Sequence, residues 1–399
     1  MERTKVDVLV CGGGIAGLVS AAAFGASGFS TLLVDPTPPV TDGDSQGSDL
    51  RSTAFLRPAR DLFRQIGIWD ILAPHAMPLD ALRIVDSLGH PPELRAERIF
   101  RGDEVGDEPF GWNFMNWLIR RELLAAVANM DGVSLRYGTG FKSMLTRTTG
   151  ALVTLSDGTF IQARLVIGAD GRHSAVREAA GIGTKITRYG QKTLAFSVTH
   201  SEPHNQVSTE IYRDGGPFTM VPLPDIDGAH ASAIVWMNRA ARAQELYDMD
   251  IASFTDAMNE RSCGLYGRLT LASGRAIWPI ITQRATQLSA ERVALVAEAA
   301  HVLPPIGAQG LNTSLNDLDV LLRLALEAPD ALGSAAMLDK YAKARHGDIA
   351  ARARVIDLFN RVTRSEDTVL QAVRMAGLKA VHDIKPIRRG VMRAGLGPI

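Results

Sequence analysis

The order of apolar and polar positions predicts two kinds of structure in different parts of the chain. Near the N-terminus, and again around residues 165 and 295, β-branched runs end in glycine turns and are followed by apolar stretches with helical spacing. This is the pattern of buried parallel strands joined by helices. Between residues 193 and 237, short strands instead follow one another with few helices. The pattern predicts an α/β protein with an inserted antiparallel sheet and a helical C-terminal region.

The first strand–helix–strand unit extends from Lys5 to Asp35 and contains the pattern G-x-G-x-x-G. Gly12 is expected to allow a sharp turn, Gly14 to let the backbone approach a pyrophosphate, and Gly17 to let the helix pack closely on the strand. The helix N-terminus favours negative charge. Asp35 ends the second strand, where an acid can accept hydrogen bonds from a ribose. The stretch predicts a dinucleotide site.

Two other interpretations of this apolar stretch are a secretion signal and a membrane span. Asp7 precedes the apolar run, the basic segment before it is thin, and glycines interrupt the helix, all of which argue against both. The 399 residues include 43 basic and 43 acidic ones, and this balance gives no indication of nucleic-acid binding. Cys11 and Cys263 provide neither a disulfide framework nor a metal cluster, so we expect no metal and a cytoplasmic location.

Two further units repeat the strand–turn–helix pattern. In the first, an apolar strand runs into Gly168, and Asp170 lies in the turn before a helix that starts near Ser174. An acid beside helix N–H groups can hold a polar ligand, although an ordinary turn remains the alternative. In the second, a strand is expected to end at Glu298, before a proline-rich turn and a helix from about Leu311. Earlier in the chain, the spacing of apolar residues predicts that a helix begins at Ala54.

These three units occur in the order Gly12–Gly17, Gly168–Gly171 and Ala297–Asn312. In order and spacing they resemble the single-component flavin-dependent aromatic hydroxylases, which have the fold of para-hydroxybenzoate hydroxylase. The resemblance extends from Lys5 to about Tyr341. Less specific matches, such as Leu50-Arg51-Ser52-Thr53-Ala54, indicate that within that group the chain most resembles the ubiquinone-biosynthesis hydroxylases.

The resemblance implies a Rossmann-like FAD-binding domain with an inserted antiparallel-sheet substrate domain and a helical C-terminal region. The FAD-binding domain would comprise residues 1–78, 112–185 and 285–345. The substrate domain would comprise residues 79–111 and 186–284, and the C-terminal region residues 346–399. We therefore expect a discontinuous FAD-binding domain assembled around the inserted sheet.

The resemblance also implies contacts for each part of FAD. The ADP half would contact the glycine motif and the acid after it, namely Gly12, Gly14, Gly17 and Asp35. Arg51 would lie near the flavin or the pyrophosphate, and Arg120 would head an R-x-x-L helix that contacts the cofactor. Asp170 would lie near the pyrophosphate and ribose, and Glu298 near the ribityl chain or the phosphates.

The flavin ring would lie at the third unit. Pro305 would lie against the ring near the substrate, and the segment Gly310-Leu311-Asn312 would contact its pyrimidine edge. The N–H groups of Leu311 and Asn312 would polarise the N1–C2=O edge, where negative charge grows on reduction. One departure from the family stands nearby. Ala297-Glu298 replaces the usual Gly-Asp pair, which adds a methyl group and a methylene next to the cofactor.

The implied reaction is flavin chemistry, so we expect no catalytic triad. NAD(P)H would reduce FAD, and reduced FAD would activate O2 to hydroxylate an electron-rich ring. The chain contains a single G-x-G-x-x-G, so NAD(P)H would bind transiently, or a protein would supply the electrons. His301 is a candidate base, but its place in an Ala-Ala-His turn favours a structural hydrogen bond.

The expected substrate is a prenylated phenol, on the family resemblance and on the apolar character of the inserted sheet. The candidate substrate contacts in that sheet are Phe218, Met220 and Trp236. Since such a substrate lives in a membrane, we expect peripheral contact at the inner face of the membrane through the C-terminal helices. The alternative for their many basic residues is a solvated face. A complex with other ubiquinone-biosynthesis proteins is a further expectation.

The sequence is also compatible with two other functions. One is hydroxylation of a small soluble aromatic compound by the same flavin fold. The other is a non-catalytic scaffold within a biosynthetic complex, which the altered Ala297-Glu298 pair leaves open.

Overall fold

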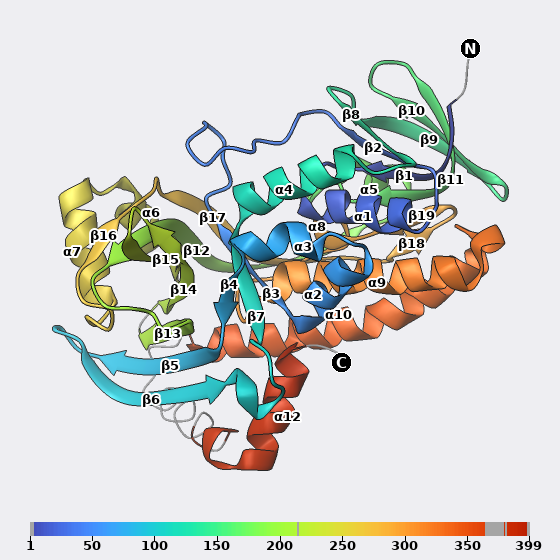
Figure 1. The fold of residues 1–399 in the computed structure, drawn as a ribbon. Helices are drawn as coiled ribbons and strands as arrows, with labels where there is room; N and C mark the ends of the chain where they lie inside the picture. Colours follow the sequence, from blue (N-terminus) through green and yellow to red (C-terminus); the bar gives the residue numbers. More distant parts are fainter. Residues whose placement is uncertain (1–3, 214, 364–378, 380, 397–399) are drawn as a thin grey trace.

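Two large β-sheets with helices packed around them form the framework (Figure 1). The computed structural model describes residues 4–213, 215–363, 379 and 381–396. Eight described strands form the first sheet, in the order β18–β19–β11–β1–β2–β8, with β10 and β9 continuing from β11. Their bounds are β1 Thr4–Cys11, β2 Thr31–Asp35, β8 Val133–Tyr137, β9 Phe141–Arg147, β10 Gly150–Leu155, β11 Phe160–Gly168, β18 Ser289–Ala290 and β19 Val293–Leu295.

The centre of this first sheet is parallel, as the apolar runs predicted. β1 pairs in parallel with β2 and with β11, and β11 pairs in parallel with β19. The parallel register brings the ends of these strands to one edge, where Cys11 lies beside Val34 and Gly168. The turns that follow β1, β2 and β11 therefore meet at the same edge of the sheet.

Nine described strands form the second sheet, in the order β20–β17–β12–β15–β14–β13–β5–β6, with β16 beside β12. Its pairs are antiparallel except for β13 and β5, which are parallel. That exception departs from the predicted antiparallel sheet, because β5 comes from a segment more than a hundred residues earlier in the chain. The bounds are β5 Ala81–Leu88, β6 Glu93–Arg101, β12 Thr184–His200, β13 Val207–Arg213, β14 Gly216–Ile226, β15 Ala229–Arg239, β16 Leu269–Leu271, β17 Ala276–Ala285 and β20 His301–Val302.

Most strands of the two sheets come from the segments predicted for the two domains, with β20 as an exception. It lies within residues 285–345 but pairs with β17 of the second sheet. The predicted domain boundaries stay a prediction. None of the described helices is both long enough and apolar enough to cross a membrane.

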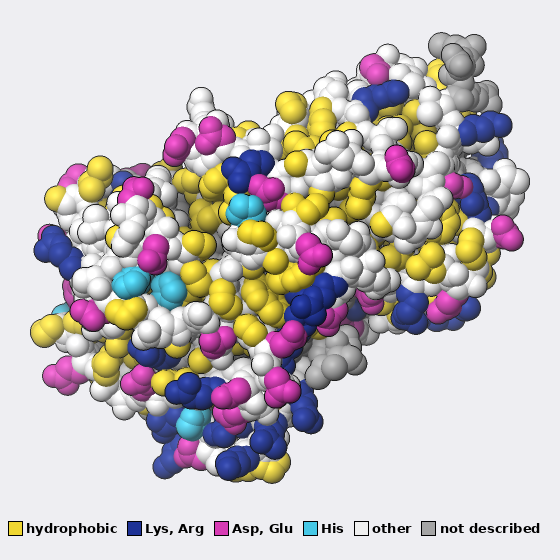
Figure 2. Space-filling model, in the orientation of Figure 1, with side chains coloured by type: hydrophobic (Ala, Val, Ile, Leu, Met, Phe, Trp, Pro, Cys, Tyr) yellow, Lys and Arg dark blue, Asp and Glu magenta, His cyan; other side chains and the backbone are white. Residues whose placement is uncertain are grey.

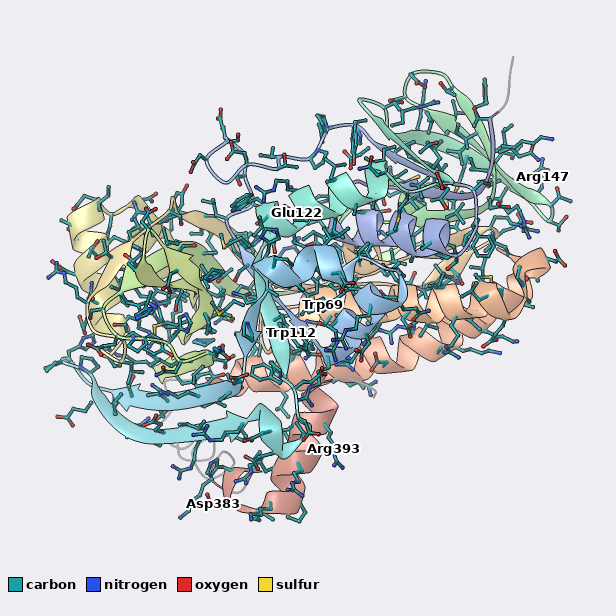
Figure 3. The ribbon with its side chains drawn as sticks, viewed as in Figure 1. Trp69, Trp112, Glu122, Arg147, Asp383 and Arg393 are labelled. Atoms are coloured by element: carbon teal, nitrogen blue, oxygen red, sulfur yellow. The ribbon has the colours of Figure 1, made fainter. Side chains whose placement is uncertain are left out.

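A small third sheet corrects the prediction of a helix from Ala54. β3 (Ser52–Leu56) and β4 (Met77–Leu79) both pair with β7 (Gly111–Met115), and helix α2 begins only at Arg57. Pro58 lies in the first turn of α2, where its missing N–H is not needed. Trp112 of β7 meets Trp69 edge to face at a centroid distance of 5.3 Å (Figure 3).

Long helices pack around the first sheet and hold the turns at its edge in position. α1 is buried almost throughout, and it contacts both α4 and α9. Two other helices, α6 and α7, cover one face of the second sheet. The bounds are α1 Ile15–Ala26, α2 Arg57–Gln65, α3 Trp69–Leu72, α4 Asn116–Ala128, α5 Ala175–Ala179, α6 Ala240–Asp248, α7 Ile251–Arg261, α8 Ala297–Ala300, α9 Gln309–Glu327, α10 Ala335–Thr363 and α12 Lys385–Leu396.

The C-terminal prediction is tested only in part. The helical region expected over residues 346–399 contains the second half of α10 and the whole of α12. Residues 364–378, 380 and 397–399 of that region lie outside the described residues. The predicted strand ending at Glu298 is shorter than expected, because β19 stops at Leu295 and Glu298 belongs to the short helix α8.

Candidate functional site

The turn between β1 and α1 has the geometry that its three glycines predicted. Gly12 has a φ of +116°, and a Cβ there would lie 2.3 Å from the carbonyl oxygen of Ala169. At Gly17 a Cβ would lie 1.9 Å from the carbonyl oxygen of Gly12, so only glycine permits this packing of helix on strand. At Gly14, by contrast, no atom lies within 4 Å of the Cβ position. The turn is therefore closed toward the protein and open at Gly14.

Asp35 lies beside this turn, at the end of β2. Its Oδ2 accepts a hydrogen bond from the N–H of Gly13 at 2.6 Å, and its Oδ1 accepts one from the N–H of Thr37 at 2.8 Å. Asp35 is directly opposite Tyr137 in the sheet. Burial and the charge of Asp35 raise the pKa of Tyr137 to about 12. Tyr137 was missed at the sequence level, since only the pairing of β8 with β2 brings it here.

Asp170 lies in the turn after β11, against the glycine turn. Its Oδ2 accepts a hydrogen bond from the N–H of Val176 at 3.1 Å. The N–H of Ala169 donates to the carbonyl oxygen of Cys11 at 2.8 Å, which ties the two turns together. Burial first, and then the charge of Asp170, raise the pKa of the Cys11 thiol well above its usual value. A neutral, buried Cys11 side chain is consistent with packing in the core and with no chemical role.

Asp49 holds the two predicted arginines together, although the sequence did not single it out. Its carboxylate accepts from Arg51 Nε at Oδ1 and from Arg51 Nη2 at Oδ2, both at 2.7 Å. Asn116 donates to the same carboxylate at 3.0 Å, and Arg120 Nη2 lies 3.8 Å from it. Burial acts to raise the pKa of Asp49, but the hydrogen bonds and charge of Arg51 lower it below its ordinary value.

The guanidinium of Arg51 has two further neighbours beside Asp49. It lies 5.3 Å from the centre of the Trp278 ring, on β17. Burial acts to lower its pKa, but contact with Asp49 and the charge of Glu298 raise it above the ordinary value. Glu298 is exposed, in the first turn of α8. The structure therefore brings Arg51 and Arg120 together at Asp49, and Glu298 lies close enough to Arg51 for their charges to interact.

Ala297 adopts a backbone conformation that favours glycine, with a φ of +54°. A left-handed conformation costs an L-residue about 1–2 kcal/mol. Its N–H donates to Asp317 Oδ2 at 3.4 Å, which helps to hold the turn. The departure from the family's Gly-Asp pair therefore places strain at this turn.

The N-terminus of α9 contains the third predicted contact segment. Gly310, Leu311 and Asn312 lie in its first turn, whose N–H groups have no partner within the helix. The Asn312 side chain accepts from the N–H of Leu56 at 2.9 Å and donates to the carbonyl oxygen of Ala54 at 2.7 Å. It thereby fixes α9 against β3. No atom lies within 4 Å of a Cβ built on Gly310, and Pro305 before the helix is exposed.

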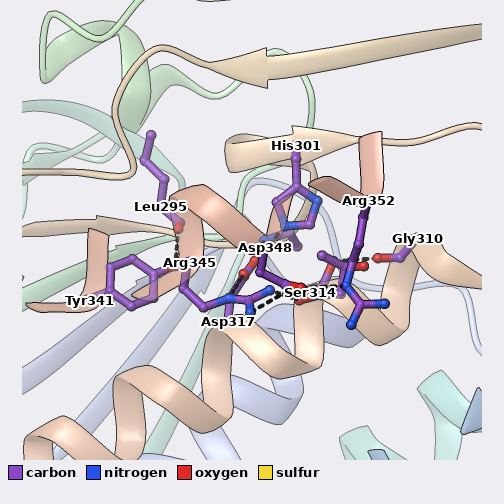
Figure 4. Close-up of polar contacts among 11 residues, drawn as sticks. Leu295, His301, Gly310, Ser314, Asp317, Tyr341, Arg345, Asp348 and Arg352 are labelled. Atoms are coloured by element: carbon purple, nitrogen blue, oxygen red, sulfur yellow. Dashed lines mark hydrogen bonds and ion pairs between the residues drawn. The ribbon is translucent and has the colours of Figure 1, made fainter. Parts of the chain in front are cut away.

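A buried network of charges fixes this helix against α10 (Figure 4). Asp317 Oδ2 contacts His301 Nε2 at 2.6 Å, and Asp317 Oδ1 accepts from Arg345 Nε at 2.8 Å. The side chains of all three residues are almost fully buried. Burial acts to raise the pKa of Asp317, but the charges and hydrogen bonds of His301 and Arg345 lower it. His301 therefore makes the structural contact that its sequence context favoured.

The same network continues to the first residue of α9. Arg345 Nη1 contacts Asp348 at 2.7 Å, and the other oxygen of Asp348 accepts from Arg352 Nε at 2.9 Å. Arg352 in turn donates to the side chain of Gln309. The network therefore joins the Ala297 turn to the N-terminus of α9, which are two of the segments predicted to contact the cofactor.

The three predicted substrate contacts do not lie in an open site. Phe218, Met220 and Trp236 are all buried in the core beneath α6 and α7. Phe218 packs edge to face on Trp236 at 5.3 Å. Their burial in this core argues against substrate contact, and alternate residues of the same strands point to the opposite face of the sheet.

The opposite face of the second sheet lies toward the third sheet. Thr219 pairs with Val235, so they share this face, and Val221 follows Thr219 on it. All three are half-buried. Ser197 belongs to the same face, since it pairs with Ala233, and its hydroxyl lies 4.0 Å from the sulfur of Met115 on β7. This face, lined by Ser197, Thr219, Val221 and Val235, is the better candidate for substrate contact.

The arrangement fits an extended dinucleotide. The backbone is open at Gly14 and Gly310, where a side chain would meet no protein atom. Three buried polar atoms along the path between the adenosine end and the flavin end have no hydrogen-bond partner among the described residues. They are the Tyr137 hydroxyl, Asp170 Oδ1 and Arg120 Nε. Buried polar atoms are usually paired, and a bound dinucleotide would supply partners to these three.

Comparison with known proteins decides the family. A family described as "FAD binding domain" matches residues 5–354. Ubiquinone hydroxylase UbiL of Rhodospirillum rubrum is 30% identical over 401 aligned positions, which cover 98% of this chain and 90% of that protein. The chain belongs to this family of FAD-dependent hydroxylases. The predictions of FAD as cofactor and of a ubiquinone-hydroxylase relationship are confirmed.

Other members of the hydroxylase family are similar over their full length. The 3-demethoxyubiquinol 3-hydroxylase of Escherichia coli is 26% identical and covers 100% of both chains. The mouse ubiquinone biosynthesis monooxygenase COQ6 is 27% identical, covering 98% of this chain and 90% of its own. Among solved structures, p-nitrophenol 4-monooxygenase PnpA from Pseudomonas putida gives a TM-score of 0.80 at 17% identity, over 99% of each chain. This likeness confirms the predicted fold class.

Proposed function

We propose that this FAD-dependent hydroxylase adds oxygen from O2 to the aromatic ring of a prenylated phenol in ubiquinone biosynthesis. The observation that carries the proposal is the full-length similarity to hydroxylases named for ubiquinone substrates. The sheet face of Ser197, Thr219, Val221 and Val235 supports it, because these four side chains carry no charge and Ser197 lies against Met115 of the third sheet. A wall without charged side chains suits a prenyl chain better than it suits a charged carboxylic acid.

FAD, when bound, supplies the redox chemistry and the activation of O2. The chain's own residues would bind and orient it. Asp35 and Tyr137 would contact the adenosine end, and the N-terminus of α1 at Gly14 would face the pyrophosphate. Asp170 would accept a hydrogen bond from a ribose or ribityl hydroxyl through its unpaired Oδ1.

Two features would act at the flavin end. The N–H groups at the start of α9 would stabilise negative charge on the pyrimidine edge of the ring. Arg51 and Arg120 would be held in place by Asp49, so that neither side chain must be ordered when the cofactor binds. We therefore assign Asp49 a positioning role within the proposed site.

The electron donor and the partners are also part of the proposal. NAD(P)H would bind transiently, because FAD would occupy the single G-x-G-x-x-G of the chain. The proposal also includes a complex with other enzymes of the pathway. It further includes peripheral contact with the membrane in which the substrate dissolves.

Profiling of quinone intermediates in a strain that lacks the protein tests this function. We expect a prenylated phenol lacking one hydroxyl group to accumulate, and the wild-type gene to remove it. A Gly14→Ala variant should not restore the product, whereas Gly347→Ala on exposed α10 should. An unchanged quinone pool contradicts the pathway. Turnover of simple phenolic acids by the purified protein, without turnover of prenylated phenols, would instead support a soluble substrate.

A further inference from the structure

Helix α12 carries basic and apolar side chains on separate stripes of its surface. Lys385, Arg389 and Arg393 are four residues apart, so they lie along one side of the helix, and all three are exposed. Ile387 and Val391 form a second stripe, 45% and 49% exposed, and Ile384, which precedes the helix, is 46% exposed. Large apolar side chains are seldom left this exposed beside one another without a function.

The helix itself carries only basic charge. Residues 384–396 contain four basic residues and no acidic residue, and Asp383 just before them contacts His382. Arg388 pairs with Glu104 on the second sheet's side of the molecule, with Nε 2.7 Å from the carboxylate, and so attaches the helix to the body. Among the described residues, no ion pair joins Lys385, Arg389 or Arg393 to a carboxylate. Their positive charge is therefore available to an external partner.

The two stripes together have the character of a helix that lies in a membrane interface. Such helices combine Lys and Arg with exposed aliphatic side chains and bind anionic lipid. Lys and Arg gather at the lower end of the molecule, over α12, in Figure 2. We propose that the α12 surface, formed by Ile384, Lys385, Ile387, Arg389, Val391 and Arg393, docks onto an anionic lipid bilayer.

The α12 surface lies next to the proposed flavin site. Near the end of α12, the carbonyl oxygen of Gly395 accepts a hydrogen bond from Gln309 Nε2 at 3.0 Å. Gln309 is the first residue of α9, whose N-terminal turn would face the flavin. A bilayer bound by α12 would therefore lie close to the site that needs a membrane-dissolved substrate. This last step rests on the proposed hydroxylation, and the docking specifies the membrane contact that the proposed function includes.

Flotation of the purified holoenzyme with lipid vesicles tests the docking. The vesicles contain phosphatidylcholine alone or with about one-third phosphatidylglycerol. We expect the wild type to float only with the anionic vesicles, and 0.5 M NaCl to release it. The variant Lys385→Glu/Arg389→Glu/Arg393→Glu should lose about 100-fold or more in partitioning, since each basic residue near an anionic surface contributes about fivefold.

A matched control changes the same number of charges elsewhere. Lys142→Glu/Arg147→Glu/Lys340→Glu alters exposed positions, and Figure 3 places Arg147 at the far end of the molecule from Arg393. We expect this variant to float like the wild type. Thermal melting and the flavin absorbance of both variants confirm that they are folded. If the wild type does not float, or if the α12 variant floats as well as the control, the proposal is wrong.

Because flotation needs no substrate, its outcome is independent of the hydroxylation that we propose. A second measurement connects the two. With a prenylated phenol supplied in anionic vesicles, we expect the α12 variant to lose turnover, while turnover of the same phenol dispersed in detergent remains at the wild-type rate. Equal loss in both media would contradict docking as the cause.

Discussion

Gly14 offers a sharp test of the cofactor site, because adding a side chain there meets no protein atom. The residue has a φ of −72° and a ψ of 177°, which alanine adopts without strain. The substitution Gly14→Ala places a methyl group on the open side of the turn, where the pyrophosphate would approach the backbone. We therefore expect the variant to fold normally and to bind FAD poorly.

The two expected effects differ enough in size to separate them. Alanine at a helix N-cap is less favourable than glycine, and we expect a loss of about 0.5–1 kcal/mol in the free energy of unfolding. Loss of one or two charge-assisted hydrogen bonds to a phosphate costs about 1.5–3 kcal/mol each. This corresponds to a rise in the FAD dissociation constant of about 10-fold to more than 100-fold.

The assay is titration of apoprotein with FAD, followed by quenching of flavin fluorescence, together with urea denaturation of the apoprotein. Gly347→Ala is the matched control, since its Cβ also meets no atom within 4 Å but lies in exposed α10. A dissociation constant within threefold of the wild-type value for Gly14→Ala would refute the assignment of the pyrophosphate to this turn.

Three further predictions concern the charged groups and the strained turn. Asp49→Ala should weaken FAD binding by about tenfold, because Arg51 loses the hydrogen bonds that hold its side chain in place. In the same titration Asp49→Asn should weaken binding less, since its side-chain oxygen still accepts a hydrogen bond from Arg51. Ala297→Gly should raise the free energy of unfolding by about 0.5–1 kcal/mol in urea, because the relief of a positive φ exceeds the entropy that glycine adds to the unfolded chain. The lowered pKa of Asp317 stabilises the fold above the unfolded value near 3.9, and this stabilisation is lost as the pH falls through the lower folded pKa. Asp317→Asn should therefore destabilise the protein by about 3–5 kcal/mol at pH 7, because it removes the buried negative charge between His301 and Arg345, and should flatten the acid limb of its stability curve; an unchanged limb would contradict the role of Asp317.

Features that depend on neighbouring residues could be predicted from the sequence. The parallel strands, the helix that follows Gly12 and the acid at Asp35 could all be predicted, because strand and glycine-turn signals act over a few residues. The long helices α9 and α10 followed from spacing in the same way. The order of the three cofactor units identified the family, since order along the chain is a property of the sequence alone.

Contacts between residues far apart in the chain could be read only from the folded structure. Alternation in β14 revealed two faces, but the packing of α6 and α7 decided that Phe218 lies in the core and Thr219 on the opposite face. Tyr137 reaches Asp35 through strand pairing. Asp49 and the Asp317 network likewise join groups from separate elements. Such contacts depend on the free energy of the whole packed chain, and local propensity holds no information about them.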